Sequence, residues 1–260
     1  MLKNKFIVYI IALIFVSNIF ADRLADIKKA GVLKAGVKID FEPFGFKSRK
    51  GEIIGFDIDI MKEIAKNMGV ELMLIPVTSA NRIQYILDNK VDVVAASMTH
   101  KIQRDKKIDF TITYFYDGQS ILANRSINAR SYKDFEYKKV GAQLGSSSGK
   151  VFEVIQPLST MVYKKDFSTL IEDLKSGKID AITSDYGFLR TLAKKNKDKF
   201  KIIGKKFTVE PYGIGLPENE SNLRDALNIA IQKSVKTKNY KRIYKKWFNS
   251  NPTKMPRLWP

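Results

Sequence analysis

VDVVAASMTHKIQRDKKIDF, residues 91–110, is the part of the sequence around which the rest of this chain is arranged. It begins with an apolar run that is too short for a helix and therefore predicts a buried strand. Ser97 and Thr99 follow at the carboxyl end of that strand, and Arg104 comes five residues after Thr99. Ligands of open α/β sheets bind outside the carboxyl ends of the strands. The stretch thus predicts a small-molecule site in which Arg104 binds a carboxylate through two hydrogen bonds. The alternative is that Arg104 is a surface arginine at the charged start of a helix.

Strands and helices alternate before this stretch. Residues 32–39 and 70–77 are apolar runs of strand length. Between them lies a helical pattern that we expect Asp57 to cap and Gly69 to end. Alternation of this kind predicts an α/β protein with mostly parallel sheets and helices on their faces.

The chain contains a weak internal repeat. Residues 87–97 and 174–185 each combine a helix end, a lysine and an apolar strand that carries an aspartate. The repeat predicts one similar βα unit in each half of the molecule, with chance similarity as the alternative.

A glycine and serine turn, residues 145–149, precedes a helix that we expect to start near Lys150. Such a turn directs free backbone N–H groups toward an anion, although a plain helix cap has the same pattern. The spacing of its glycines is not that of a phosphate-binding loop, because they lie one residue too close together.

The first 21 residues predict a secretory signal peptide. A basic start is followed by a short apolar run and the small residue Ala21, after which we expect cleavage; an uncleaved anchor is the alternative. The chain has no cysteine, which excludes disulfides and a lipid anchor on an N-terminal cysteine. We therefore expect a periplasmic protein that is not a lipoprotein.

The chain is strongly basic, with 46 Lys and Arg against 27 Asp and Glu and a formal charge of +19. Nucleic acid, anionic lipid or an acidic ligand are the partners that such a charge can indicate. The excess is mostly lysine in scattered pairs, without the arginine and aromatic stripe that grips nucleic acid. We interpret it as a solvated surface and expect no nucleic-acid partner.

The motifs together resemble those of one known family. In chain order they are FEPFGF, GFDIDI, NR, VDV, S-x-T, R-x-x-x-I-D-F, GSSSG, KIDAITSD and YGIGLP. This set resembles the periplasmic solute-binding proteins of amino-acid ABC transporters, solute-binding protein family 3, and is closest in pattern to the glutamate and aspartate binders. The resemblance covers the whole chain after the signal peptide.

The resemblance implies the type II periplasmic-binding-protein fold, two lobes with the ligand in the cleft between them. The first lobe would comprise residues 22–114 and 215–260, and the second lobe residues 118–210. Crossovers at residues 114–118 and 210–214 would form the hinge. A monomer without cofactor or metal is the expected form.

The resemblance also implies how the backbone end of an amino acid is held. Arg104 would pair with the α-carboxylate, helped by Thr99 and by backbone N–H groups near Ser146 and Ser147. Asp185 would bind the α-ammonium from the other lobe. The ligand would then touch both lobes and favour the closed state.

The remaining implied ligand contacts surround the ligand's side chain. Ser97 would assist at the ammonium and Phe41 would form an apolar wall. Lys38, Ser79 and Arg82 lie where glutamate and aspartate binders place cationic and hydroxyl groups. Two cations near one pocket favour an anionic side chain. The alternative is that Lys38 points to solvent and Arg82 pairs with Asp88 or another acid.

The predicted function is capture of a polar amino acid, glutamate or aspartate, for delivery to the permease of an ABC transporter. Gln143 departs from the pattern, because some relatives have lysine there. One alternative is an enzyme similar to cyclohexadienyl dehydratase. We do not expect an enzyme, because no acid or base stands out beyond Asp185. Another alternative is an amino-acid sensor or adhesin.

Overall fold

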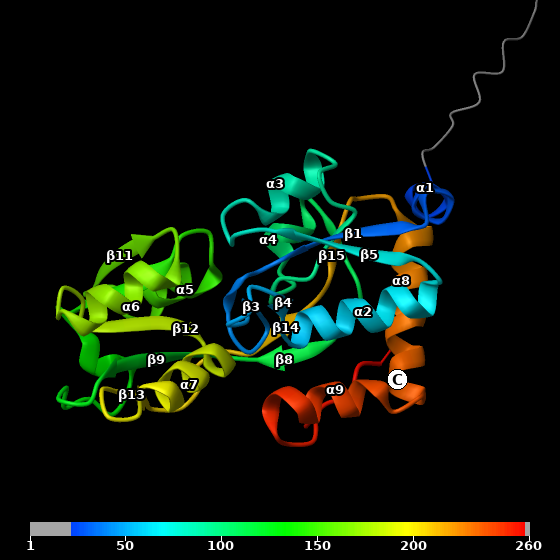
Figure 1. The fold of residues 1–260 in the computed structure, drawn as a ribbon. Helices are drawn as coiled ribbons and strands as arrows, with labels where there is room; N and C mark the ends of the chain where they lie inside the picture. The colour runs from blue at the N-terminus through cyan, green and yellow to red at the C-terminus, as the bar shows by residue number, and fades with distance from the viewer. Residues whose placement is uncertain (1–21, 258–260) are drawn as a thin grey trace, which may run out of the picture.

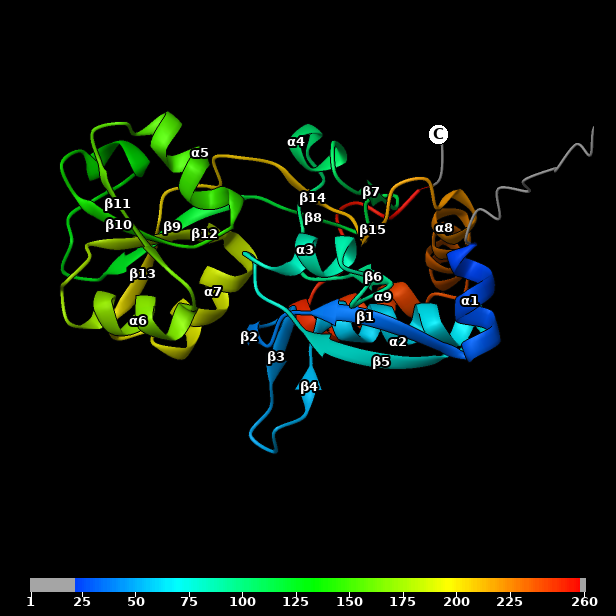
Figure 2. The same cartoon turned by 90° about the horizontal axis from the view of Figure 1, so that it is seen from above.

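The computed structural model describes residues 22–257. The predicted signal peptide, residues 1–21, lies outside the described residues, as do residues 258–260. Figures 1 and 2 show two lobes side by side, each built around one sheet with helices against it. In the part of the chain that is described, we find no helix with the length and apolar character needed to cross a membrane.

Lobe 1 is built on a five-stranded sheet with the spatial order β5-β1-β6-β15-β7. Strand β1 runs parallel to β5 and β6, while β15 runs antiparallel to β6 and β7, so four of the five strands point the same way. The predicted strands at residues 32–39 and 70–77 are confirmed as β1 and β5. The strands of this sheet are β1 (Val32–Val37), β5 (Glu71–Pro76), β6 (Val93–Val94), β7 (Asp109–Phe110) and β15 (Gly215–Leu216).

Helices cover the sheet of lobe 1, α2 packing against β1 and β5, and α3 against β6 and β15. A small sheet, β2-β3-β4, extends from the same lobe. The helices of lobe 1 and the strands of its small sheet are α1 (Arg23–Ala30), β2 (Asp40–Phe41), β3 (Gly45–Lys47), β4 (Ile53–Ile54), α2 (Phe56–Met68), α3 (Arg82–Leu87), α4 (Ile102–Asp105), α8 (Ser221–Lys236) and α9 (Asn239–Phe248).

The start of α2 differs from the prediction, because Asp57 does not cap the helix. The helix begins at Phe56, directly after Gly55, which has a φ of 144°. A Cβ added to Gly55 would lie only 2.0 Å from the Phe44 carbonyl oxygen, so only glycine fits this position. Asp57 instead lies in the first turn and is fully buried. Its carboxylate accepts hydrogen bonds from other elements, which a sequence pattern does not reveal.

Lobe 2 is built on a second five-stranded sheet with the order β11-β10-β12-β9-β13, in which only β9 runs against the others. Helix α5 begins at Ser147, three residues before the predicted start, because Ser146 already has the extended backbone of an N-cap. The elements of this lobe are β9 (Gln119–Asn124), the 3-10 helix η1 (Tyr132–Phe135), β10 (Lys139–Gln143), α5 (Ser147–Ile155), β11 (Thr160–Lys164), α6 (Phe167–Lys175), β12 (Ala181–Asp185), α7 (Tyr186–Lys195) and β13 (Phe200–Ile203).

Two strands connect the lobes. β8 (Phe115–Asp117) and β14 (Glu210–Tyr212) pair antiparallel, with Glu210 opposite Asp117. Figure 1 shows both strands between the two sheets. The chain therefore crosses between the lobes along a paired ribbon.

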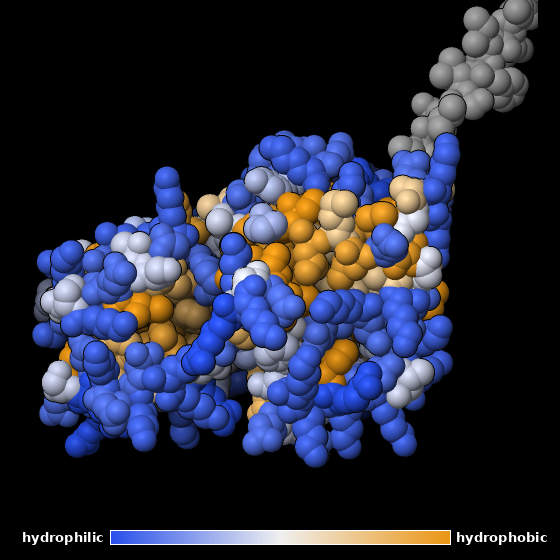
Figure 3. All heavy atoms as spheres, viewed as in Figure 1, coloured by the Kyte–Doolittle hydropathy of each residue, from blue (hydrophilic) through white to orange (hydrophobic). Residues whose placement is uncertain are grey.

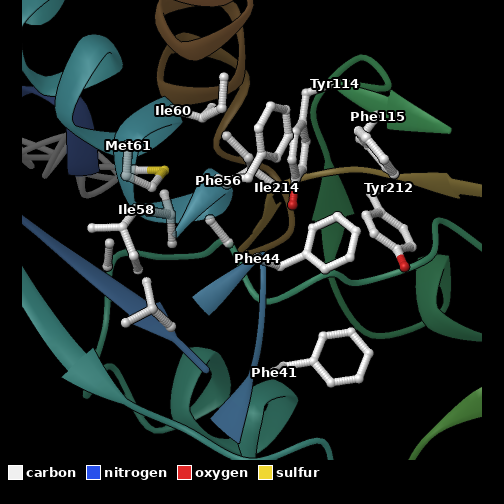
Figure 4. Packing of buried hydrophobic residues seen from close by; sticks show 14 of the residues in the cluster. Phe41, Phe44, Phe56, Ile58, Ile60, Met61, Tyr114, Phe115, Tyr212 and Ile214 are labelled. Carbon is white, nitrogen blue, oxygen red and sulfur yellow. The ribbon is translucent and has the colours of Figure 1, made fainter. Parts of the chain in front are cut away.

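The core beside these strands is aromatic. Figure 4 shows Phe44, Phe56, Tyr114, Phe115 and Tyr212 gathered near the start of α2, where Phe56 lies. The ring centroids of Phe44 and Phe115 are 5.1 Å apart, and those of Phe115 and Tyr212 are 5.5 Å apart. Rings at this spacing bury large apolar areas and fix one another's orientation. The cluster therefore provides a rigid base for the residues at the junction of the lobes.

The surface is predominantly hydrophilic on the face seen in Figure 3, with a hydrophobic band over β1 and β5. This agrees with the interpretation of the lysine excess as solvated.

Candidate functional site

A small cavity of about 10 Å³ lies between the two lobes, and both contribute to its wall. Nine of the ten predicted site residues line it, and Arg104 does not. Ser148, Phe167 and Ser184 also line it, although sequence reasoning did not identify them. The lining residues are Lys38, Phe41, Ser79, Arg82, Ser97, Thr99, Ser146, Ser147, Ser148, Phe167, Ser184 and Asp185.

Asp185 is the acid that lobe 2 brings to the cavity, from the end of β12. The Tyr212 hydroxyl donates to its Oδ2 at 2.7 Å. Burial and the nearby charge of Glu210 raise the pKa of Asp185 to about 6. A cationic group of a ligand would stabilise the ionised form of Asp185, and the attraction between the two charges would favour binding at this position.

Arg82 is the cation that lobe 1 places in the cavity wall. It is 3% exposed, and its Nη1 donates to the Ala96 carbonyl at 2.6 Å. Its Nε is buried without a hydrogen-bond partner within residues 22–257. Burial and the nearby Arg104 lower the pKa of Arg82 to about 9. A buried guanidinium with an unsatisfied N–H is suited to an anion.

Arg104 lies in the groove next to the cavity rather than in the cavity wall. Its Nη1 donates to the Thr99 carbonyl at 2.6 Å. Groove and cavity share Ser146 and Ser147, at the start of α5. Burial lowers the pKa of Arg104, opposed by Asp185. The guanidinium is thus at the mouth of the cavity, on the side of a helix N-terminus, where a carboxylate would be favoured.

Ser97 and Thr99 are held by acids of the protein. The backbone N–H and the hydroxyl of Ser97 donate to Asp57 Oδ2 at 2.8 and 3.0 Å, and Ser97 has the left-handed φ of 48°. The Thr99 hydroxyl donates to Glu210 Oε2 at 2.6 Å. Asp57 also accepts from the Tyr114 hydroxyl at 2.8 Å. These buried acids fix the turn after β6 in one conformation.

Two residues of the cavity wall, Lys38 and Ser79, belong to a polar cluster around Gln143, which does not itself line the cavity. Lys38 Nζ and Ser79 Oγ donate to its Oε1 at 3.0 and 2.8 Å, and its Nε2 donates to Asp40 Oδ2 at 3.2 Å. Lys38 is 3% exposed and lies 3.8 Å from the centroid of the Phe41 ring, so it does not point to solvent. Burial and Arg82 lower the pKa of Lys38 to about 8.

Phe41 forms an apolar part of the cavity wall, and its ring reaches across to lobe 2. Its ring stacks on Phe188 at a centroid distance of 4.4 Å and contacts Phe167 at 5.3 Å. The wall is therefore built by both lobes.

Three supporting residues had a sequence signal that could have been used more fully. Asp57 lies inside the GFDIDI motif, Gln143 ends a strand just before GSSSG, and Glu210 precedes YGIGLP. Their partners are distant in sequence, so the motif marks the position and not the contact. Within residues 22–257, no group of three or more histidine or acidic side chains is arranged to hold a metal ion.

The sequence resembles proteins with described functions. Residues 33–250 match the bacterial extracellular solute-binding proteins, family 3. The ABC transporter glutamine-binding protein GlnH of Bacillus subtilis (strain 168) is 36% identical over 236 residues, 89% of this chain and 86% of that protein. The L-cystine-binding protein TcyJ of Escherichia coli (strain K12) is 30% identical over 240 residues, 90% of each protein.

The fold is similar to solved structures. An ancestral arginine-binding protein bound to glutamine has a TM-score of 0.82 and 36% identity, covering 85% of this chain and 99% of that one. The two-lobed type II fold is thereby confirmed. The glutamate/aspartate import solute-binding protein of Salmonella typhimurium is only 25% identical over 241 residues, 87% of this chain and 80% of that protein. The specific resemblance to glutamate and aspartate binders is therefore not confirmed.

Proposed function

Because the chain belongs to family 3 of the bacterial extracellular solute-binding proteins, we propose that it binds a free amino acid between its lobes and delivers it to the permease of an ABC transporter. The observation that carries the proposal is the opposite charge of the two lobes at one cavity. Lobe 1 contributes the guanidinium of Arg82 in the cavity wall and that of Arg104 at the cavity mouth, and lobe 2 contributes the carboxylate of Asp185 in the wall. An α-amino acid carries the two complementary charges.

The ligand's backbone groups would bind at this end of the cavity. Its α-carboxylate would lie between Arg104, the Nε of Arg82 that has no hydrogen-bond partner among residues 22–257, and the N-terminus of α5 at Ser147. Its α-ammonium would lie at Asp185, with Ser97 nearby. A ligand held this way makes contacts in the closed state that it cannot make in an open one, so it shifts the population toward closure.

The side-chain end supports an uncharged polar ligand, with glutamine as the first candidate. Lys38 and Ser79 already donate to Gln143, which leaves less of their capacity for a side-chain carboxylate. The positive charges of Lys38 and Arg82 oppose a cationic side chain such as that of arginine. Glutamine is also the ligand named for the relative from Bacillus subtilis and for the similar ancestral structure.

Glutamate or aspartate is the second candidate. The favouring observation is that Lys38 and Arg82, two buried cations, lie in the same cavity wall. A carboxylate that displaced Gln143 would neutralise one of them. The charge of the cluster therefore supports an anionic ligand, and its hydrogen bonds support a neutral one.

The proposed location is the periplasm, after export through the signal peptide predicted at residues 1–21. The proposed partner is an ABC permease, and the proposed form is a freely diffusing monomer that is not a lipoprotein. Crossovers at residues 114–118 and 210–214 are the proposed hinge.

The test is thermal unfolding of residues 22–260, refolded to remove carried-over ligand, with glutamine, glutamate, aspartate, arginine and cystine in turn. A ligand at a hundred times its dissociation constant adds about 2.7 kcal/mol of stability, which moves the midpoint by a few degrees. We expect the largest shift with glutamine. A largest shift with glutamate or aspartate would select the second candidate, and no shift with any of them would contradict the proposed function.

A further inference from the structure

Gln143 joins the two lobes at the side-chain end of the cavity. It is the last residue of β10 and is 0% exposed. Its Oε1 accepts from Lys38 Nζ at 3.0 Å and from Ser79 Oγ at 2.8 Å, both in lobe 1. Its Nε2 donates to Asp40 Oδ2 in lobe 1 at 3.2 Å and to the Lys165 carbonyl in lobe 2 at 3.3 Å. Three of its four side-chain hydrogen bonds therefore cross between the lobes.

These bonds use the whole capacity of the side chain. A carboxamide has two acceptor lone pairs and two N–H donors, and all four are engaged. The side-chain oxygen accepts from an ammonium and a hydroxyl, and the nitrogen donates to a carboxylate and a backbone carbonyl. Gln143 therefore occupies the two donors, Lys38 and Ser79, that a ligand's side-chain carboxylate would need.

Lys38 depends on this contact. It is 3% exposed, its ammonium lies over the Phe41 ring, and Gln143 Oε1 accepts a hydrogen bond from it. A buried ammonium that loses its acceptor is strongly disfavoured. Separation of the lobes would remove Gln143 and expose Lys38 to water, so the closed state is where Gln143 has its effect.

We propose that Gln143 is a latch that occupies Lys38 and Ser79 in place of a ligand's side chain. The latch holds the lobes together at this end, and it makes the cavity select an uncharged side chain over a carboxylate. The selectivity rests on the proposed function, whereas the latch itself does not. A carboxylate ligand must displace Gln143 to reach Lys38, and a neutral one can leave it in place.

The latch is tested with spin labels on residues 22–260, refolded and without added amino acid. The sequence has no cysteine, so Lys62→Cys in lobe 1 and Lys175→Cys in lobe 2, both exposed, give a single labelled pair. Gln143→Leu removes the amide and keeps a similar volume. Gln156→Leu is the matched control, because Gln156 is also buried in lobe 2 but its amide bonds only within that lobe.

We expect a population with a short distance between the two labels, which corresponds to closed lobes, in the unsubstituted pair and in the Gln156→Leu variant. In Gln143→Leu this population should be at least fivefold smaller. An unchanged distribution in Gln143→Leu would overturn the latch, as would the absence of a short-distance population in the unsubstituted pair. Should Gln143→Leu fail to fold by circular dichroism, Gln143→Asn takes its place with the same expectation, since its amide is one methylene too short.

Selectivity is tested by calorimetric titration of glutamine and glutamate into the protein and into Gln143→Leu. Because the substitution frees Lys38, the ratio of glutamate to glutamine affinity should rise at least tenfold. An unchanged ratio overturns the selectivity. If neither amino acid binds the unsubstituted protein, the proposed function fails for these ligands, and the spin-label distances still decide the latch.

Discussion

At the scale of single residues, two guanidinium groups and one carboxylate meet at the cavity, with Arg82 and Asp185 in its wall and Arg104 at its mouth. Burial lowers the pKa values of Arg82 and Arg104 and raises that of Asp185. Each charge is therefore costly to hold until a complementary charge approaches it. This is the physical basis for affinity toward a zwitterion.

Arg104→Ala should weaken amino-acid binding by on the order of 3 kcal/mol, because the α-carboxylate loses a charged partner in a site of low polarity. Calorimetric titration of the best ligand measures the loss. Arg125→Ala is the control, since Arg125 is exposed on lobe 2 and bonds to the Lys197 carbonyl away from the cavity. Equal affinity of the Arg104→Ala and Arg125→Ala variants would exclude Arg104 as the carboxylate partner.

Asp185 should make binding pH-dependent. Its pKa is raised to about 6, and only the ionised form attracts the ligand's ammonium. Affinity should therefore be level above pH 7 and decrease below about pH 6, by up to about tenfold per pH unit. Asp185→Asn should weaken binding at pH 7.5 and flatten the profile.

Asp180→Asn is the control for Asp185→Asn. Asp180 precedes β12, and its carboxylate accepts from the Lys139 backbone outside the cavity. This variant should keep the wild-type pH profile of affinity. A profile of Asp185→Asn that follows the wild type would contradict an ammonium contact at Asp185.

At the scale of elements, closure depends on how the turn between β10 and α5 meets the turn before α3. Gly145 has a φ of 77°, and a Cβ on it would lie 2.5 Å from Ala80 Cα, which belongs to lobe 1. Only glycine allows the two turns to approach this closely. The turn that holds Ser146 and Ser147 is thereby brought to the cavity.

Gly145→Ala should prevent full closure and reduce amino-acid affinity at least tenfold. Gly177→Ala is a matched control, since Gly177 has a φ of 74° and open space around it. Both variants carry the same backbone strain of roughly 1 to 2 kcal/mol, so unfolding midpoints should fall alike. Small-angle scattering with saturating ligand should show a larger radius of gyration for Gly145→Ala only. Equal radii would contradict the role of this contact in closure.

At the scale of the whole molecule, the ribbon between the lobes carries a buried acid that opposes folding when ionised. Asp117 accepts from the Gly187 backbone at 2.9 Å, and burial, with the charge of Asp185, raises its pKa to about 7. The unfolded chain ionises the same group near pH 4. The folded state thus binds more protons between these values, and stability falls as pH rises through that window.

Asp117→Asn should raise stability at pH 8 by up to about 4 kcal/mol, because amide and protonated acid are both neutral. Urea unfolding at intervals from pH 4 to pH 8 measures the change. The decrease in the free energy of unfolding from pH 4 to pH 7 should be smaller in the variant. The decrease that is left in the variant is due partly to Asp185, whose pKa is also raised. Identical slopes for the two proteins would show that Asp117 is not the titrating group.

Much of the fold was predictable from local pattern. The strands at residues 32–39 and 70–77 and the family itself follow from apolar runs and short motifs, which depend on neighbours in sequence. Helix starts were less accurate, because Ser146 has the extended backbone of an N-cap and the carboxylate of Asp57 accepts from Ser97, 40 residues away. Local signals specify an element better than its ends.

The sequence contained enough short motifs to indicate the family, and the resemblance to that family implied the two lobes and nine of the residues that line the cavity. Such motifs can be identified from sequence because they are local to turns and strand ends. How these residues are used depends on contacts that exist only in the folded molecule. The tertiary structure engages Lys38 and Ser79 with Gln143, which is 105 residues from Lys38 and 64 from Ser79, and it places Arg104 at the mouth of the cavity. Whether a buried cation is free or already bonded depends on partners across the lobes, and no local pattern encodes them.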